Sequence, residues 1–217
     1  EILGQSETDT FIFRLNAQFS WNLAGTEGTS NWLNKWAGLM GLEAGAAEGL
    51  PTIWFVRGAA PPLNGRGAPW PTDFRILDAL QQAGWHVRDL RVIRMWWHPD
   101  RTELICELLN IPVDHMETTM MWQALHPLYE AVMFGGGLPL HAALVEHRGK
   151  GFLLAGAGGR GKSTCCARLP KDWTALSDDE TLLVRSAKKR PAAHPFPTWS
   201  VANANGRSWS VSRNVEL

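Results

Sequence analysis

A glycine-rich run in the second half of the chain has the residue types and spacing needed to bind phosphate groups. Residues 156–163 read GAGGRGKS and match the phosphate-loop (Walker A) pattern G-x-x-x-x-G-K-[ST] at every fixed position. Glycines let successive backbone N–H groups turn inward and form a concave anion site, and the alternative is a glycine-rich turn without a ligand. In this pattern the lysine reaches the β- and γ-phosphates, and the hydroxyl after it binds Mg²⁺. The predicted nucleotide-binding residues are Gly156, Ala157, Gly158, Gly159, Arg160, Gly161, Lys162, Ser163 and Thr164.

Two adjacent carboxylates follow the glycine run. Asp178 and Asp179 stand at the end of a short apolar segment. One carboxylate could hold Mg²⁺, directly or through water, and the other could accept a proton from a hydroxyl nucleophile. The alternative is an acidic turn or a helix cap, because aspartate is common at such positions. After a phosphate loop we favour the functional interpretation, in which one of the two aspartates and Ser163 would hold the metal.

A histidine lies on the strand expected before the one that leads into the loop. His141 stands in the apolar run 138–145, where a core histidine is the more frequent interpretation on pattern alone. His194 lies beside two prolines in an extended segment and is expected to be a loop residue. The histidines of the chain have no zinc-ligand spacing, and the three cysteines suit neither a disulfide framework nor a metal site.

The elements predicted around these residues follow one another in a phosphate-binding order. A strand over 151–155, the glycine run and a helix over 163–169 have the layout of a phosphate-binding βα unit. A strand over 175–177 leads into the aspartates. The other predicted elements are strands over 11–21, 52–56 and 138–146, helices over 30–42, 72–84 and 118–134, a loop over 58–71, and a hairpin of strands over 87–97 and 103–109.

Taken in this order, the residues resemble the HPr kinase/phosphorylase family. His141 and Gly156 have the separation found between that family's strand histidine and its first loop glycine, and residues 176–179 resemble its paired-aspartate segment. The resemblance covers residues 118–200. It is closest to the small members found in peptide natural-product cassettes, of the lasso-peptide kinase and SynChlorMet type. It implies an α/β (α+β) fold, with a P-loop core like that of phosphoenolpyruvate carboxykinase and a mixed α/β N-terminal region.

The resemblance also implies an activity, the transfer of the ATP γ-phosphate to a serine hydroxyl of a protein. We therefore expect a serine/threonine kinase that uses ATP and Mg²⁺, acts on a peptide or small protein, and forms homo-oligomers. Carried over by position, Lys162 contacts phosphate, Ser163 binds Mg²⁺, Asp179 accepts the proton of the hydroxyl, Asp178 supports Asp179 or the metal, and His141 lies beside the transferred phosphate.

The chain departs from the family at one ligand. A downstream glutamate that binds metal in the family would fall near Ala204, so either another acid such as Glu180 or Glu216 replaces it, or the metal site has fewer ligands. This departure keeps two other functions open. One is a non-catalytic ATP-binding adaptor in a peptide-maturation cassette, and the other is a general P-loop NTPase.

Composition and length limit the broad class. The 217 residues include 21 basic and 21 acidic side chains, and this neutral balance argues against nucleic-acid binding. No apolar run approaches the ~20 residues that span a bilayer, and with no leader visible we expect a cytoplasmic protein. We predict an N-terminal mixed α/β region over 1–117, a candidate for recognising the peptide partner. The HPr kinase-like core is predicted over 118–217, incomplete at its C-terminus.

Overall fold

The chain forms two compact units. The first comprises residues 1–12, 21–36 and 44–127, and the second comprises residues 13–20, 37–43 and 128–217. None of the helices in the described part of the chain is long and apolar enough to cross a membrane. The computed structural model describes residues 9–16, 19–26, 28–58, 84–90, 93–99, 103–109, 121–185, 191–196 and 213–217. The predicted helix over 72–84 and loop over 58–71 therefore lie, apart from one end of each, outside the described residues.

A seven-stranded sheet is formed by the first part of the chain, in the order β3-β1-β2-β4-β7-β6-β5. Strands β2, β4 and β7 run parallel, whereas β7, β6 and β5 form an antiparallel meander. The predicted strand over 52–56 is confirmed as β4, but the one predicted over 87–97 is two strands. The strands are β1 (Thr10–Arg14), β2 (Ser20–Gly25), β3 (Glu43–Ala44), β4 (Thr52–Arg57), β5 (His86–Asp89), β6 (Ile93–Trp97) and β7 (Leu104–Leu108).

The strand predicted over 11–21 is also two strands, because the chain turns at Asn16. The Asn16 side chain accepts a hydrogen bond from the Phe19 N–H at 3.1 Å, and its carbonyl accepts one from the Ser20 hydroxyl at 2.6 Å. Asparagine favours turns through side-chain bonds of this kind. The alternation of apolar and polar residues continues across this turn in the sequence, and it therefore predicted one continuous strand.

Helix α1 (Ser30–Met40) packs on β4 through aromatic side chains. Trp32 and Trp36, one turn apart, stack with ring centroids 5.4 Å apart. The ring of Phe55 in β4 lies 5.6 Å from that of Trp32 and 5.1 Å from that of Trp36. The helix predicted over 30–42 is thus confirmed, and its apolar positions form part of a core.

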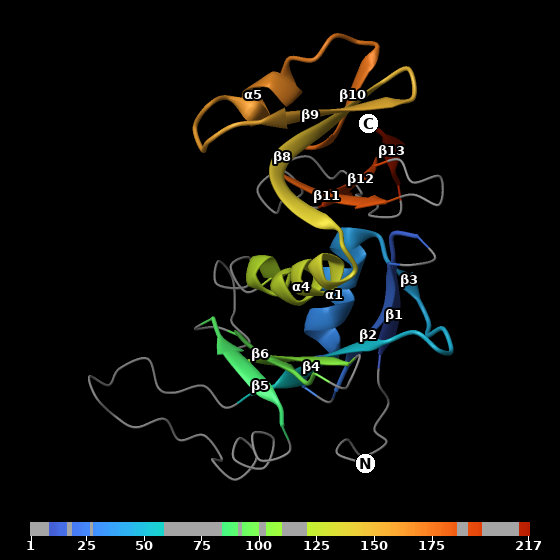
Figure 1. The fold of residues 1–217 in the computed structure, drawn as a ribbon, viewed down its shortest axis with the longest axis vertical. Coiled ribbons are helices and arrows are strands. Elements are labelled where there is room, and N and C mark those ends of the chain that lie inside the picture. Colours follow the sequence, from blue (N-terminus) through green and yellow to red (C-terminus); the bar gives the residue numbers. More distant parts are fainter. Residues whose placement is uncertain are drawn as a thin grey trace, which may run out of the picture. The chain divides into compact units, whose positions relative to one another are not determined.

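The second unit is built around a closed sheet of five strands, in which the long, curved β8 is easily followed in Figure 1. The order is β10-β8-β11-β12-β13-β9, and β8 also pairs with β9, so β8, β11, β12, β13 and β9 form a ring. The core of this unit includes an apolar cluster of Leu144, Leu176, Ala193 and Val215. The elements are α4 (His126–Phe134), β8 (Leu138–His147), β9 (Lys150–Ala155), α5 (Lys162–Ala167), β10 (Trp173–Ser177), β11 (Glu180–Arg185), β12 (Pro191–Phe196) and β13 (Val215–Glu216).

The predicted α/β fold class, with a P-loop core like that of phosphoenolpyruvate carboxykinase, is wrong. The described chain is mostly β, with two sheets and only short helices. In the second unit β8 and β9 form an antiparallel hairpin, and after α5 the chain returns as β10, antiparallel to β8. Helix α5 has only six residues and none is buried, so it cannot cover a parallel sheet as a crossover helix does. The predicted order of strand, glycine loop and helix is confirmed, but this order does not specify which strands pair with one another.

Candidate functional site

Three segments of the second unit converge at the middle of β8. The first four residues of β8 pair with β11 and the last four pair with β10. The β10–β11 turn, which holds Asp178 and Asp179, therefore faces the point on β8 where the partner strand changes. On the other edge of β8, Ala142 pairs with Ala155, the last residue of β9, and the glycine loop begins directly after it. The ladder thus brings together His141, the glycine loop and the aspartates.

The glycine loop connects β9 to α5 and is exposed from Gly156 to Gly161. Gly159 and Gly161 have φ angles of 75° and 88°, in the left-handed region that favours glycine. A Cβ added to Gly158 would meet no atom within 4 Å, so packing within the protein does not demand glycine there. The loop therefore presents open backbone on the side from which a phosphate group would approach.

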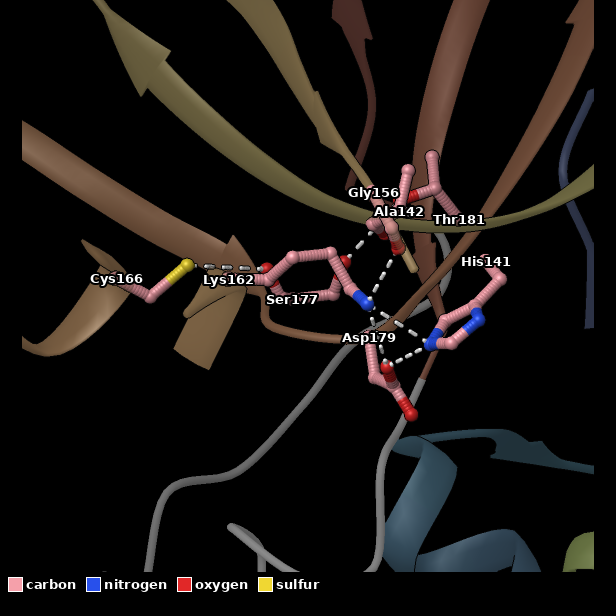
Figure 2. Close-up of polar contacts among 8 residues, drawn as sticks. All are labelled: His141, Ala142, Gly156, Lys162, Cys166, Ser177, Asp179 and Thr181. Atoms are coloured by element: carbon pink, nitrogen blue, oxygen red, sulfur yellow. Dashed lines mark hydrogen bonds and ion pairs between the residues drawn. The ribbon is translucent and has the colours of Figure 1, made fainter. Parts of the chain in front are cut away.

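The side chains of Lys162, His141 and Asp179 point toward one another (Figure 2). His141 Nε2 lies 2.5 Å from Asp179 Oδ1, and Lys162 Nζ lies 3.0 Å from the same nitrogen and 3.8 Å from that oxygen. Lys162 also donates a 3.0 Å hydrogen bond to the Gly156 carbonyl. The Lys162 side chain is 9% exposed, whereas those of His141 and Asp179 are 53% and 43% exposed. A shielded cation thus lies beside an acid that is open to a substrate.

The chemistry of the groups decides the direction of these hydrogen bonds. An ionised carboxylate can only accept, so His141 Nε2 carries the proton and donates to Asp179. A protonated Nε2 has no lone pair to offer, and Lys162 then depends on the Gly156 carbonyl and the Asp179 carboxylate. One ring nitrogen cannot form a hydrogen bond with both partners. Lys162 would therefore lose the fewest hydrogen bonds of the three side chains when it turns toward a phosphate group. Asp179 would stay held by His141.

Buried hydroxyls support the turn that carries Asp179. Thr181 Oγ1 donates a 2.8 Å hydrogen bond to the Ala142 carbonyl and lies 3.3 Å from Ser177 Oγ (Figure 2). Ser177 and Thr181 are both fully buried, one before the turn and one after it. Both ends of the turn are therefore fixed to each other and to β8 by hydrogen bonds shielded from water.

The part of the chain that carries this arrangement matches a known family. Residues 104–217, just over half of the chain, match the family model of the SynChlorMet cassette protein ScmC. The chain belongs to this family. The matched region contains the glycine loop, His141 and both aspartates, and thus every site residue predicted from the sequence. No curated protein matches the chain.

The two aspartates of this ScmC-family chain lie in different surroundings. Asp178 is buried, with 6% of its surface exposed, whereas Asp179 is open. Glu180, considered above only as a substitute metal ligand, also faces the cluster. Burial raises the pKa of Glu180, and the Asp179 charge adds to this, while the nearby His141 and Lys162 lower it electrostatically.

Tyr129, in helix α4, was missed by the sequence analysis. Burial raises the pKa of Tyr129, and the negative charge of Glu180 raises that pKa further. The apolar periodicity of the predicted helix indicated a core face and gave no reason to connect a tyrosine there to the aspartates.

Glu216 and His194 do not lie with the cluster. Glu216, the other substitute ligand considered, pairs in register with Lys150 at the start of β9, about 16 Å along the strand from the end that leads into the loop. His194 was expected in a loop but lies in β12, 1% exposed and in register with Leu182 of β11. Glu180 is thus the acid that lies beside the aspartates.

The residues present suit a magnesium ion that also binds phosphate. Ser163 and Thr164 are exposed in the first turn of α5, next to the loop. No group of three or more histidine, cysteine, aspartate or glutamate residues in the described chain could hold a metal ion. Mg²⁺ typically takes only one or two protein ligands and completes its shell with phosphate oxygens and water. The Ser163 hydroxyl and one aspartate would therefore suffice when a nucleotide is bound.

Proposed function

We propose that this ScmC-family protein is a kinase that transfers the γ-phosphate of ATP to a serine or threonine hydroxyl of a peptide or small protein. The observation that carries the proposal is the convergence of the loop lysine, His141 and Asp179 on one point. The likeness to HPr kinase in the order of these residues supports it, although the fold class differs from the one first expected. Family membership supports a peptide as the acceptor, because the family is named for a cassette.

The proposed reaction assigns one role to each group of the cluster. Asp179 accepts the proton of the acceptor hydroxyl as its oxygen attacks the γ-phosphorus atom. The bond from that phosphorus to the bridging oxygen breaks, and ADP leaves with the electron pair. Lys162 compensates the negative charge that develops on the oxygens of the transferred phosphate, and the backbone N–H groups of the glycine loop bind the remaining phosphate oxygens of the nucleotide. His141 donates to Asp179 and keeps its carboxylate aimed at the hydroxyl.

Mg²⁺ is the ion expected with the nucleotide. It would be held by the Ser163 hydroxyl and Asp178, and it would supply positive charge at the β- and γ-phosphates. Because Asp178 is almost completely buried, it would contact Mg²⁺ through a water molecule. The exposed Asp179 would receive the proton.

Mass spectrometry tests the proposal directly. The protein is incubated with Mg·ATP and the short peptides encoded beside its gene, and phosphopeptides are sought. We expect phosphate on a serine or threonine. Asp179→Asn should lower the rate about 10²–10⁴-fold by removing the base. Lys162→Ala should lower it about 10²–10³-fold and weaken ATP binding, whereas Lys171→Ala, an exposed lysine outside the loop, should change neither.

The same experiment separates the alternatives. ATP binding without any phosphopeptide or ADP would replace the kinase by a nucleotide-binding adaptor. Steady formation of ADP with water as the acceptor would indicate a general P-loop NTPase. Undiminished peptide phosphorylation in Asp179→Asn would remove this site from the reaction.

A further inference from the structure

Strand β8 changes its partner strand beside the candidate site. Its residues 138–141 are in register with β11, and its residues 144–147 are in register with β10. Ala142 and Ala143 therefore lie between the two ladders, directly after His141. Ala142 is buried. A buried carbonyl at such a break needs a hydrogen-bond donor, because an unpaired buried carbonyl costs stability.

The Thr181 side chain supplies this donor. Its Oγ1 lies 2.8 Å from the Ala142 carbonyl oxygen and 3.3 Å from Ser177 Oγ (Figure 2). A carbonyl can only accept, so the single hydroxyl proton of Thr181 goes to Ala142. Ser177 then donates to Thr181, and the three groups form a chain of hydrogen bonds that runs in one direction. Ser177 and Thr181 are fully buried, where linked hydrogen bonds strengthen one another.

This chain of hydrogen bonds links the two backbone segments that carry His141 and Asp179. Ala142 directly follows His141, and Thr181 lies two residues after Asp179. The bond from Thr181 to Ala142 thus holds the two segments at a fixed separation beside the candidate site. The Asp179 side chain is 43% exposed, so its position depends on the backbone that carries it as well as on His141.

We propose that the Ser177 and Thr181 hydroxyls position the Asp179 carboxylate against His141 by closing the break between the two ladders of β8. The proposal rests on the proposed kinase function, in which Asp179 is the base. Both hydroxyls act through the backbone of the β10–β11 turn. Their loss misplaces the base without removing it.

Substitutions that remove or keep the hydroxyl test the proposal. Thr181→Val keeps the shape of the side chain and removes the donor to Ala142. We expect kcat for peptide phosphorylation to fall about tenfold to a hundredfold, because small misplacements of reacting groups have effects of this size. KM for ATP should stay within about twofold, since the glycine loop is untouched. Thr181→Ser keeps the donor and should keep most of kcat. Ser177→Ala should cost less than Thr181→Val, because Ala142 then still has its donor.

A matched control accounts for lost stability. Thr29→Val removes a buried hydroxyl that donates to the Phe55 carbonyl at 2.9 Å in the first unit. It should lower the unfolding midpoint and leave kcat unchanged. The positioning role is overturned if Thr181→Val keeps full kcat, if it lowers kcat only as far as Thr29→Val does, or if Thr181→Ser is as impaired as Thr181→Val.

A second readout does not depend on activity. In protein labelled with ¹⁵N histidine, the nitrogen shifts of the His141 ring report which nitrogen carries the proton, and their loss in His141→Asn assigns them. Nε2 should carry it in the wild-type protein, because it donates to Asp179. Thr181→Val should raise the share of the Nδ1–H form and Thr29→Val should not, whereas unchanged shifts in Thr181→Val would overturn the positioning role. If the wild-type protein phosphorylates nothing but the shifts respond, the proposed kinase function fails and the hydroxyls still position Asp179 against His141.

Discussion

At the scale of single residues, the site combines a lysine that is shielded from solvent with a neighbouring aspartate that is exposed to it. Lys162 is 9% exposed and Asp179 is 43% exposed, although their charged atoms are 3.8 Å apart. A lysine shielded in this way keeps little freedom to lose when it turns to a phosphate group, so its binding costs little entropy. Asp179 faces solvent and can receive a proton from a hydroxyl that arrives from outside. His141 Nε2 lies closer to each of them, at 3.0 Å from Lys162 Nζ and 2.5 Å from Asp179 Oδ1, than the two lie to each other in their ion pair.

The two cysteines after the glycine loop should react at different rates. Cys165 is exposed, whereas Cys166 is half-buried with its Sγ 3.9 Å from the Ser177 carbonyl. Burial, with the Asp178 charge, raises the pKa of Cys166 to about 11, so about 0.1% of it is thiolate at pH 8. We expect iodoacetamide at pH 8 to alkylate Cys165 first, as seen by fragment-ion mass spectrometry. Faster alkylation of Cys166 would contradict the placement of α5.

At the scale of elements, the sequence pattern predicted individual strands and helices, but it did not predict which strands pair. The strands predicted over 138–146 and 151–155 and the helix over 163–169 are confirmed as β8, β9 and α5 within two residues at each end. The contact between His141 and Asp179 joins residues far apart in sequence, and it exists because β11 runs antiparallel to β8. No local periodicity specifies that register. The fold class failed for the same reason, since the ring closes through β13, a strand of two residues.

Helix α4 shows the same limit on one element. In the helix predicted over 118–134, five apolar residues share one face: Met121, Leu125, Leu128, Val132 and Met133. Leu128 and Val132 are fully buried, but Met133 is 47% exposed. Whether an apolar residue near the end of a helix is buried depends on the elements that pack there. Met133 lies at such an end, because the helix stops before Gly135.

The hydrogen bonds that tie β11 to β8 give a prediction at this scale. Thr181→Val keeps the shape of the side chain but leaves the Ala142 carbonyl without its 2.8 Å donor in a buried place. We expect the free energy of unfolding to fall by about 1–3 kcal/mol, measured by urea denaturation. Thr174→Val, on the exposed surface of β10, should change it by less than about 0.5 kcal/mol. Equal effects of the two substitutions would contradict the buried bond.

At the scale of the whole molecule, the two units share elements of the chain instead of being joined by a linker. Residues 13–20 and 37–43 belong to the second unit, although most of the second unit lies beyond residue 127. Helix α1 is continuous across residue 36, so one helix supplies residues to both units. Fraying of α1 removes packing from both. We infer that the two units unfold together.

A core substitution tests this coupling. Trp36 is fully buried and packs on Trp32 and Phe55, so Trp36→Ala should lower the free energy of unfolding by about 3–5 kcal/mol. Pulsed alkylation along a urea series then reports each unit, through the buried Cys106 of β7 in the first and Cys166 of α5 in the second.

Both thiols should become reactive at the same, lower urea concentration in Trp36→Ala, because α1 belongs to both units. Trp122→Ala removes a tryptophan that is 46% exposed and should move neither midpoint appreciably. A shift confined to Cys106 would mean that the first unit unfolds alone. The cluster of His141, Lys162 and Asp179 could then be studied on the second unit by itself.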